Sequence, residues 1–247
     1  MLRPAACHTR GMTKSQGPDA DTGAARGWRA GFFPLLLGGL LVGLSVPRLM
    51  AEIALLPGNH LLDAVQRGAR LGAGDLQKLI ATQRRALAWT GSARIRIDLA
   101  SAEISAVDNE PGGSASDNQT MARAIEDLRA GLVQAPADPE AWTRAAYAGI
   151  AEGQPARQIV PILAMAIETA PIAPGLIFPR LELCLVEWPY LSEAVRALVD
   201  EQIRIAWRQS PEHLAGLAAA TGRKDAVREA LEESDRAAFD GIANPAK

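Results

Sequence analysis

Aromatic residues are scarce in this chain of 247 residues, at 4%, although apolar residues of all kinds make up 48%. The apolar fraction comes mainly from Leu, Ala, Ile and Val. Few aromatic rings, and no long stretch in which apolar and polar residues alternate, argue against a β-sandwich, whereas Ala, Leu and Arg favour closely packed helices. The composition therefore predicts an all-α protein with room for about one domain and its appendages.

Cysteine is also rare, and the two that occur, Cys7 and Cys184, lie on opposite sides of the longest apolar run. If that run spans a membrane, the two thiols cannot meet and no internal disulfide forms. Cys184 stands in the apolar stretch 181–186, where we expect it to be a small buried hydrophobic residue.

Residue patterns that carry catalysis or bind metals are missing from the sequence. His8, His60 and His213 are isolated and share no metal-like spacing with Cys or carboxylates. There is no Gly-x-Ser-x-Gly motif, phosphate-binding loop or dinucleotide fingerprint. Adjacent carboxylates such as Glu126 and Asp127 diverge by about 100° on a helix, so they do not form an acid–base pair. We therefore expect no catalytic residue, no metal and no cofactor, and a protein that is not an enzyme.

Charge is distributed unevenly along the chain. Residues 1–29 carry five Lys and Arg against two Asp, whereas residues 50–247 carry 20 Lys and Arg against 26 Asp and Glu. An acidic domain with dispersed arginines is a poor electrostatic match for a phosphate backbone, so we expect no nucleic-acid partner.

The longest apolar run covers residues 30–47, which are 18 residues without a charge. As a helix this run is about 27 Å long, close to the hydrocarbon thickness of a bilayer. We predict a transmembrane helix over 30–49 that binds the lipid bilayer, after a disordered basic tail over 1–29. The alternative is a cleaved signal peptide, but its apolar core is usually about 7 to 15 residues and ends in a small-x-small site, which is not evident here.

The basic tail also predicts the orientation of the span. More Lys and Arg precede the run than closely follow it, so the positive-inside rule places the N-terminus in the cytoplasm. Residues 50–247 then form a periplasmic domain of a bacterial inner-membrane protein.

Helical periodicity, interrupted by Pro and Gly, runs through residues 50–247. In the segment 190–209, apolar residues recur at spacings of three and four, with Ser192 and Ser210 as plausible stops. The segment 108–117, rich in Gly, Ser and Asp, is expected to be a flexible loop. The predicted helices are 75–89, 94–104, 124–136, one that begins at 138, 156–170, 190–209, 212–220 and 224–238.

The segment 124–142 contains a spacing of large and small residues that suits two packed antiparallel helices. In the first helix, Ala is followed by a large residue and then by a small one, and Pro comes at the end, at the spacing expected of the second helix in a packed pair. In the next helix, a large residue precedes two small ones. Small residues let helix backbones approach, and large ones fill the groove beside them. The residues that carry this register are Ala124, Leu128, Gly131, Pro136, Trp142, Ala145 and Ala146.

This segment resembles a tetratricopeptide repeat unit, and the same register extends with departures over about 180 residues. The resemblance implies a degenerate array of antiparallel helix pairs, an α-solenoid, although an irregular helical bundle remains the alternative. It also implies a membrane-anchored scaffold that binds envelope or inner-membrane proteins. Anchored arrays of this kind serve envelope assembly, including polysaccharide export, and the resemblance does not choose among such processes.

Three aromatic residues are candidates for contact with a partner protein. Trp188 and Tyr190 flank a proline at a turn between helices, where an aromatic pair can anchor a peptide or can instead plug the end of the core. Tyr147 is placed where it can point into a groove of the array. A different hypothesis makes the protein an accessory subunit that acts through its membrane helix, because Gly39-x-x-x-Gly43 fits a helix-packing pattern.

The orientation is testable with reporter fusions at the C-terminus. Because we expect residues 50–247 outside the cytoplasm, a fused alkaline phosphatase should be active and a fused cytoplasmic β-galactosidase inactive. The reverse pattern would contradict both the orientation and the envelope location.

Overall fold

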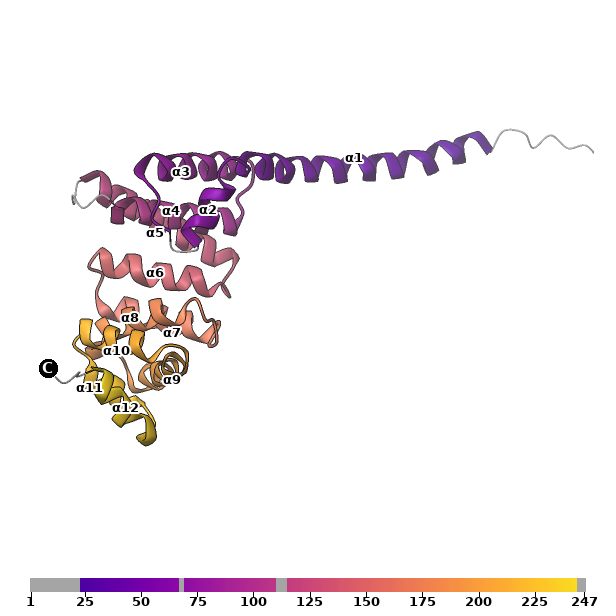
Figure 1. Ribbon diagram of the computed structural model, residues 1–247. Helices are drawn as coiled ribbons and strands as arrows, with labels where there is room; N and C mark the ends of the chain where they lie inside the picture. The colour runs from indigo at the N-terminus through magenta and orange to yellow at the C-terminus, as the bar shows by residue number, and fades with distance from the viewer. Residues whose placement is uncertain (1–22, 67–68, 110–114, 244–247) are drawn as a thin grey trace, which may run out of the picture. The chain divides into compact units, whose positions relative to one another are not determined.

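The computed structural model describes residues 23–66, 69–109 and 115–243 (Figure 1). Every regular element within these ranges is helical. The predicted all-α fold is therefore confirmed for the described part of the chain. The chain divides into two compact units, Met1–Pro47 and Arg48–Lys247.

Helix α1 (Gly23–Leu55) contains the apolar run. Its segment Leu36–Leu55 is 20 residues long with a mean hydropathy of 1.5, and it is the one stretch of the described chain long and apolar enough to cross a membrane. Leu40 and Leu44 are 59% and 65% exposed. Side chains of this kind are stable when lipid rather than water surrounds them, which fits a single membrane span near the N-terminus.

The bounds of α1 differ from the predicted 30–49. The helix begins at Gly23, within the tail predicted to be disordered, and the rest of that tail, residues 1–22, lies outside the described residues. At the other end it continues to Leu55 because its last turns are covered by protein. Ala51 is 1% exposed and packs with Ala86 and Ile95, and Pro57 then prevents further helix.

The second unit continues with short helices that pack mainly against their neighbours in the chain. Figure 1 shows them following one another through this unit, and the short connections between them favour antiparallel neighbours. The helices are α2 (Asn59–Gln66), α3 (Ala73–Leu87), α4 (Ala93–Asn109), α5 (Ala115–Gln134), α6 (Pro139–Ala151), α7 (Ala156–Glu168), α8 (Ile177–Val186), the 3-10 turn η1 (Trp188–Tyr190), α9 (Glu193–Gln209), α10 (Pro211–Ala220), α11 (Lys224–Ala230) and α12 (Glu233–Ala243).

Buried apolar side chains form a succession of clusters along the second unit. One joins the end of α1 to α3 and α4, a second joins α2, α3 and α4, and a third joins α4, α5 and α6. The largest cluster extends from α6 through the C-terminal helices. From α3 to α9 each helix is therefore buried chiefly by the helices next to it in the chain, whereas α10 packs mainly against α12.

The residues of the predicted packing register lie at helix contacts. Ala124 and Leu128 are fully buried, and a Cβ added at Gly131 would lie 2.9 Å from Cγ1 of Ile97 on α4. The indole N–H of Trp142 donates a hydrogen bond to the Pro136 carbonyl at 2.8 Å. Fully buried Ala146 and partly buried Ala145 occupy the next helix, α6.

The predicted loop 108–117 is shorter than expected at both ends. Helix α4 continues to Asn109, and α5 begins at Ala115, while residues 110–114 lie outside the described residues. Contacts with distant segments hold the end of α4. The Tyr147 hydroxyl donates to Asp108 Oδ1 at 2.7 Å, and Asn109 Nδ2 donates to the Leu71 carbonyl at 3.1 Å.

The prediction of a single helix over 224–238 is wrong, because two helices, α11 and α12, occupy this segment. Leu231 between them is extended and only 2% exposed. The Arg236 guanidinium donates to the Leu231 and Glu229 carbonyls, which satisfies carbonyls at the end of α11. The break turns both Leu231 and the Phe239 ring into the C-terminal core.

Replacing Gly149 by Val tests the packing of α6 on α7. A Cβ at this position would lie 2.5 Å from Cδ1 of the fully buried Ile159, so the free energy of unfolding should fall by about 1–3 kcal/mol. Urea unfolding of the full chain in detergent measures the change.

Gly216→Ala is the matched control, because a Cβ on this α10 glycine meets nothing within 4 Å. It should raise the free energy of unfolding by about 0.4–1 kcal/mol. A Gly149→Val chain as stable as wild type would show that α6 and α7 are not in close contact.

Candidate functional site

A groove of about 660 Å³ lies between α4, α6 and α8. These are alternate helices of the chain, and consecutive helices that reverse direction leave every second helix on the same side of an array. The residues that line the groove are Ile104, Ser105, Asp108, Glu140, Thr143, Arg144, Tyr147, Ile150, Ala151, Gly175, Leu176, Pro179, Glu182, Leu183 and Val186.

Apolar side chains make up much of the lining. Ile104 on α4 and Leu183 on α8 are buried, and Ile150 on α6 is half-buried. Val186, at the end of α8, is 48% exposed although it is apolar. Apolar surface that is concave and rimmed by polar groups is typical of a binding site for a peptide or a small molecule.

Tyr147 stands in the groove and is held by a residue of another helix. Its hydroxyl donates to Asp108 Oδ1 on α4 at 2.7 Å. Burial, the Asp108 carboxylate and then the charge of Glu182 raise the pKa of Tyr147 well above its usual range. The phenol therefore stays neutral, and its ring bridges the α4 and α6 walls of the groove.

The groove lining is acidic, because it contains three carboxylates and one guanidinium. Arg144 is already engaged by Glu140, one turn earlier on α6, through its Nε at 3.2 Å and its Nη2 at 2.6 Å. Asp108 and Glu182 form no ion pair with any residue in the described part of the chain. They give the groove a negative field that favours cationic groups of a ligand.

Behind the groove, the fully buried side chain of Arg180 connects three helices. Its Nε donates to Thr143 Oγ1 on α6 at 3.3 Å, and its Nη1 donates to the Ala170 carbonyl after α7 at 2.8 Å. Nη2 has no hydrogen-bond partner among the described residues, and burial lowers the pKa of the guanidinium. Arg180 thus fixes α8 relative to α6, which are two walls of the groove.

Cys184 follows Arg180 by one helical turn and is fully buried. Burial raises the pKa of its thiol to about 12, with Arg180 opposing that rise. The thiol is therefore neutral and unreactive, which confirms the prediction of a small buried hydrophobic residue. The other cysteine, Cys7, lies outside the described residues, so the predicted absence of a disulfide stays a prediction.

A further carboxylate with a changed pKa lies on α4. The Asp98 side chain is only 15% exposed, and burial raises its pKa to about 6. The charge of Arg94, whose Nε lies 3.8 Å from Asp98 Oδ2, opposes the rise, and Glu140 on α6 adds to it. Asp98 therefore changes protonation in mildly acidic solution.

Of the three aromatic residues predicted to contact a partner, only Tyr147 lines the groove. Trp188 is half-buried against the C-terminal core, and the Arg196 guanidinium lies 5.4 Å from the centre of its ring. Tyr190 is 67% exposed, but it does not line the groove. Trp188 therefore packs against the core, and its contact with a partner stays a prediction.

Three charged residues in or next to the groove, Asp108, Glu182 and Arg180, were not predicted from the sequence as site residues. Asp108 was assigned to a loop, and the contact of Arg180 with Thr143 joins residues 37 positions apart. The spacing of Pro179, Glu182 and Val186 by three and four was a usable signal, since it places the three on one face of a helix.

No group of three or more His, Cys, Asp or Glu side chains within the described ranges could hold a metal ion. His213 stacks on the ring of Phe178, with 4.0 Å between the ring centroids. No protein-family model matches this chain, and no curated protein matches it. The groove and the candidate membrane segment are therefore the features that bear on function.

Asp98→Asn tests the buried carboxylate through the pH dependence of stability. The folded pKa of about 6 exceeds the ordinary value of 3.8, so the folded chain binds the proton more tightly than the unfolded chain. The stabilisation is present below about pH 4 and is lost as the pH rises to about 6, by up to roughly 3 kcal/mol. Asp98→Asn should remove this fall, as measured by urea unfolding at several pH values.

The exposed Asp225 on α11 supplies the matched control. Asp225→Asn should keep the pH dependence of the wild-type chain. An Asp98→Asn variant that keeps it as well would contradict the burial of Asp98.

Proposed function

We propose that this protein is a membrane-anchored scaffold with a tetratricopeptide-like helical array, whose groove between α4, α6 and α8 binds a segment of a partner protein. The observation that carries the proposal is a groove built from alternate helices in a chain that also has a candidate membrane span. Concave surfaces formed by stacked helix pairs are what solenoid proteins use for binding.

Two features of the packing support a repeat-like array. Small residues stand where helices approach most closely, as at Gly131 against Ile97 and at Gly149 against Ile159. The buried clusters also follow one another along the chain, as expected when each repeat is buried only by its neighbours.

The groove favours a partner segment with apolar and basic side chains. Apolar anchors fit between Ile104, Leu183 and Val186, while Lys or Arg side chains meet the carboxylates of Asp108 and Glu182. Charge complementarity of this kind chiefly determines which partner binds and how fast it associates. Tyr147 between these groups supplies a large contact area at low entropic cost.

The candidate membrane segment supports an envelope location for the proposed function. With the N-terminus in the cytoplasm, the array lies in the periplasm close to the inner membrane, and its partners are envelope or inner-membrane proteins. Envelope assembly, including assembly of envelope polysaccharide, is the kind of process that such an anchored scaffold serves.

A second candidate function is that of an accessory subunit acting through the membrane helix. A Cβ added at Gly39 or Gly43 would meet nothing within 4 Å, so this side of α1 is open to another helix. Replacing both glycines by Leu should abolish assembly with a partner in this case and leave it intact if the groove is responsible.

Site-specific photocrosslinking in native membranes tests the groove. A photoreactive phenylalanine analogue in place of Tyr147 should give a discrete adduct, because this ring lies in the proposed contact, and Tyr190 outside the groove is the control position. Reversing two charges, with Asp108→Lys and Glu182→Lys, should abolish the adduct, since both carboxylates would become cations.

The double substitution Gly39→Leu and Gly43→Leu distinguishes the two candidates in the same assay. Retention of the Tyr147 adduct supports the groove, and its loss supports the membrane helix. Equal adducts at positions 147 and 190, or an adduct unaffected by charge reversal, would exclude the groove as the binding site.

A further inference from the structure

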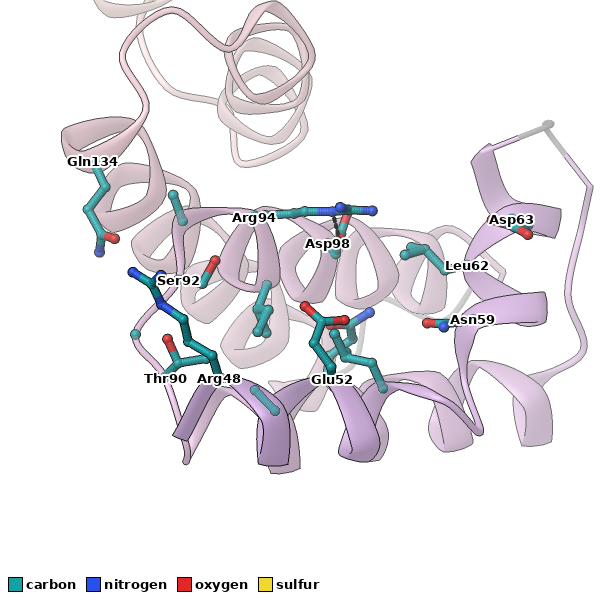
Figure 2. A pocket seen from close by; sticks show the side chains of 16 residues that line it. Arg48, Glu52, Asn59, Leu62, Asp63, Thr90, Ser92, Arg94, Asp98 and Gln134 are labelled. Atoms are coloured by element: carbon teal, nitrogen blue, oxygen red, sulfur yellow. Dashed lines mark ion pairs between the residues drawn. The ribbon is translucent and has the colours of Figure 1, made fainter. Parts of the chain in front are cut away.

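A second cavity, of about 790 Å³, lies where the chain enters the second unit (Figure 2). Its walls come from the end of α1, from α2, α3 and α4, from the turn between α3 and α4, and from the last residue of α5. It shares no lining residue with the groove between α4, α6 and α8. The residues that matter here are Arg48, Glu52, Gln83, Thr90, Ser92 and Asp98.

This cavity begins at the first charge after the apolar run. Arg48 directly follows Pro47, and Glu52 lies one turn later in the same helix, α1. The candidate span Leu36–Leu55 includes both residues. Charged side chains are costly in hydrocarbon, however, so the uncharged run 30–47 is the part expected in the bilayer core, which leaves both residues near the lipid headgroups. One wall of the cavity therefore begins, along the chain, within about one helical turn of the end of the apolar run.

The two ends of the cavity differ in chemistry. Figure 2 shows the Arg48 side chain on the same side as Thr90 and Ser92, which is a cation beside two hydroxyl groups. Glu52 rises from α1 into the cavity, and Asn59 and Asp63 of α2 lie beyond it. One end therefore suits an anion and the other a cation.

Neither Arg48 nor Glu52 forms an ion pair with another described residue. Asp98 differs, because Arg94 lies across it at 3.8 Å (Figure 2). Both Arg48 and Glu52 are exposed, so each is available to a ligand.

The Gln83 side chain in the cavity lining provides a second, independent observation. Its side chain is 1% exposed, and its Oε1 has no hydrogen-bond partner among the described residues. A buried polar atom without a partner costs about 1–3 kcal/mol. The amide oxygen accepts hydrogen bonds only, so it suits a donor such as an ammonium N–H.

We propose that this cavity binds the zwitterionic headgroup of phosphatidylethanolamine. Arg48, Thr90 and Ser92 bind the phosphate, and Glu52 and Gln83 Oε1 accept hydrogen bonds from the ammonium. Charge-assisted bonds of these two kinds are the strong ones available to a headgroup. A membrane lipid is the ligand of this chemistry expected at a cavity whose first wall directly follows the apolar run in the chain.

Lipid retention by the full chain tests the proposal. The protein is purified from nanodiscs containing phosphatidylethanolamine, phosphatidylcholine and phosphatidylglycerol in equal amounts, and bound lipid is counted by native mass spectrometry. Phosphatidylethanolamine should be retained about tenfold over both others. Phosphatidylcholine has the same charges but no ammonium N–H to donate to Gln83, so this comparison needs no substitution and does not depend on how a variant folds.

Two variants test which end of the cavity binds the ammonium and which end binds the phosphate. Glu52→Gln should reduce the preference for phosphatidylethanolamine over phosphatidylglycerol at least fivefold, and Arg48→Gln should reduce retention of all three lipids. Both residues are exposed, so neither change should unfold the chain. Arg85→Gln, an exposed α3 residue that lines neither cavity, is the matched control and should retain lipid as wild type does.

A soluble analogue of the headgroup tests whether the cavity binds the whole lipid or only the headgroup chemistry. Millimolar O-phosphoethanolamine should leave lipid retention unchanged, because the acyl chains hold the lipid at the site. Full displacement of the lipid would identify a soluble phosphate ester as the ligand and would overturn the lipid assignment. Equal retention of the three lipids by wild type, or unchanged retention in both Arg48→Gln and Glu52→Gln, would also overturn the proposal.

Discussion

The second unit depends on close contact between helices that follow one another in the chain. Gly131 and Gly149 stand where an added Cβ would collide with Ile97 and Ile159, so two helix pairs can approach only because these residues have no side chain. Close approach buries the neighbouring apolar residues in successive clusters. The same close approach determines how the helices are placed, and therefore that α4, α6 and α8 line the groove.

Polar side chains then fix the register of individual helix pairs. Arg84 on α3 binds buried Glu103 on α4 at 2.5 Å, and Arg96 on α4 binds Asp127 on α5 at 2.8 Å. Burial still raises the pKa of Glu103, although Arg84 opposes that rise. Pairs of this kind add little net stability, but loss of one partner leaves a buried charge, which penalises a shifted register. Arg180 links α6 and α8 in the same way without a carboxylate.

The two cavities of the second unit differ in position and in charge. The cavity at Arg48 starts at the end of the apolar run and contains both signs of charge, which suits a group at the membrane surface. The groove between α4, α6 and α8 is more apolar and lacks a free cation, since Arg144 is engaged by Glu140. A lipid contact at one site and a protein contact at the other would together hold a partner protein beside the bilayer.

Several features follow from the sequence by itself because their causes are local. The apolar run, the all-helical composition and the helix starts at Asp138 and Ser192 depend on residues within a few positions of each other, and the Asp138 carboxylate does accept hydrogen bonds from two backbone N–H groups at 3.0 Å. Only the tertiary structure decided the extent of α4, the break at Leu231 and the assembly of the groove. These depend on contacts such as Tyr147 with Asp108 and Arg180 with Thr143, which join residues nearly 40 positions apart. A sequence pattern indicates which segments form helices. Which side chains from distant segments contact one another is determined only when the helices pack.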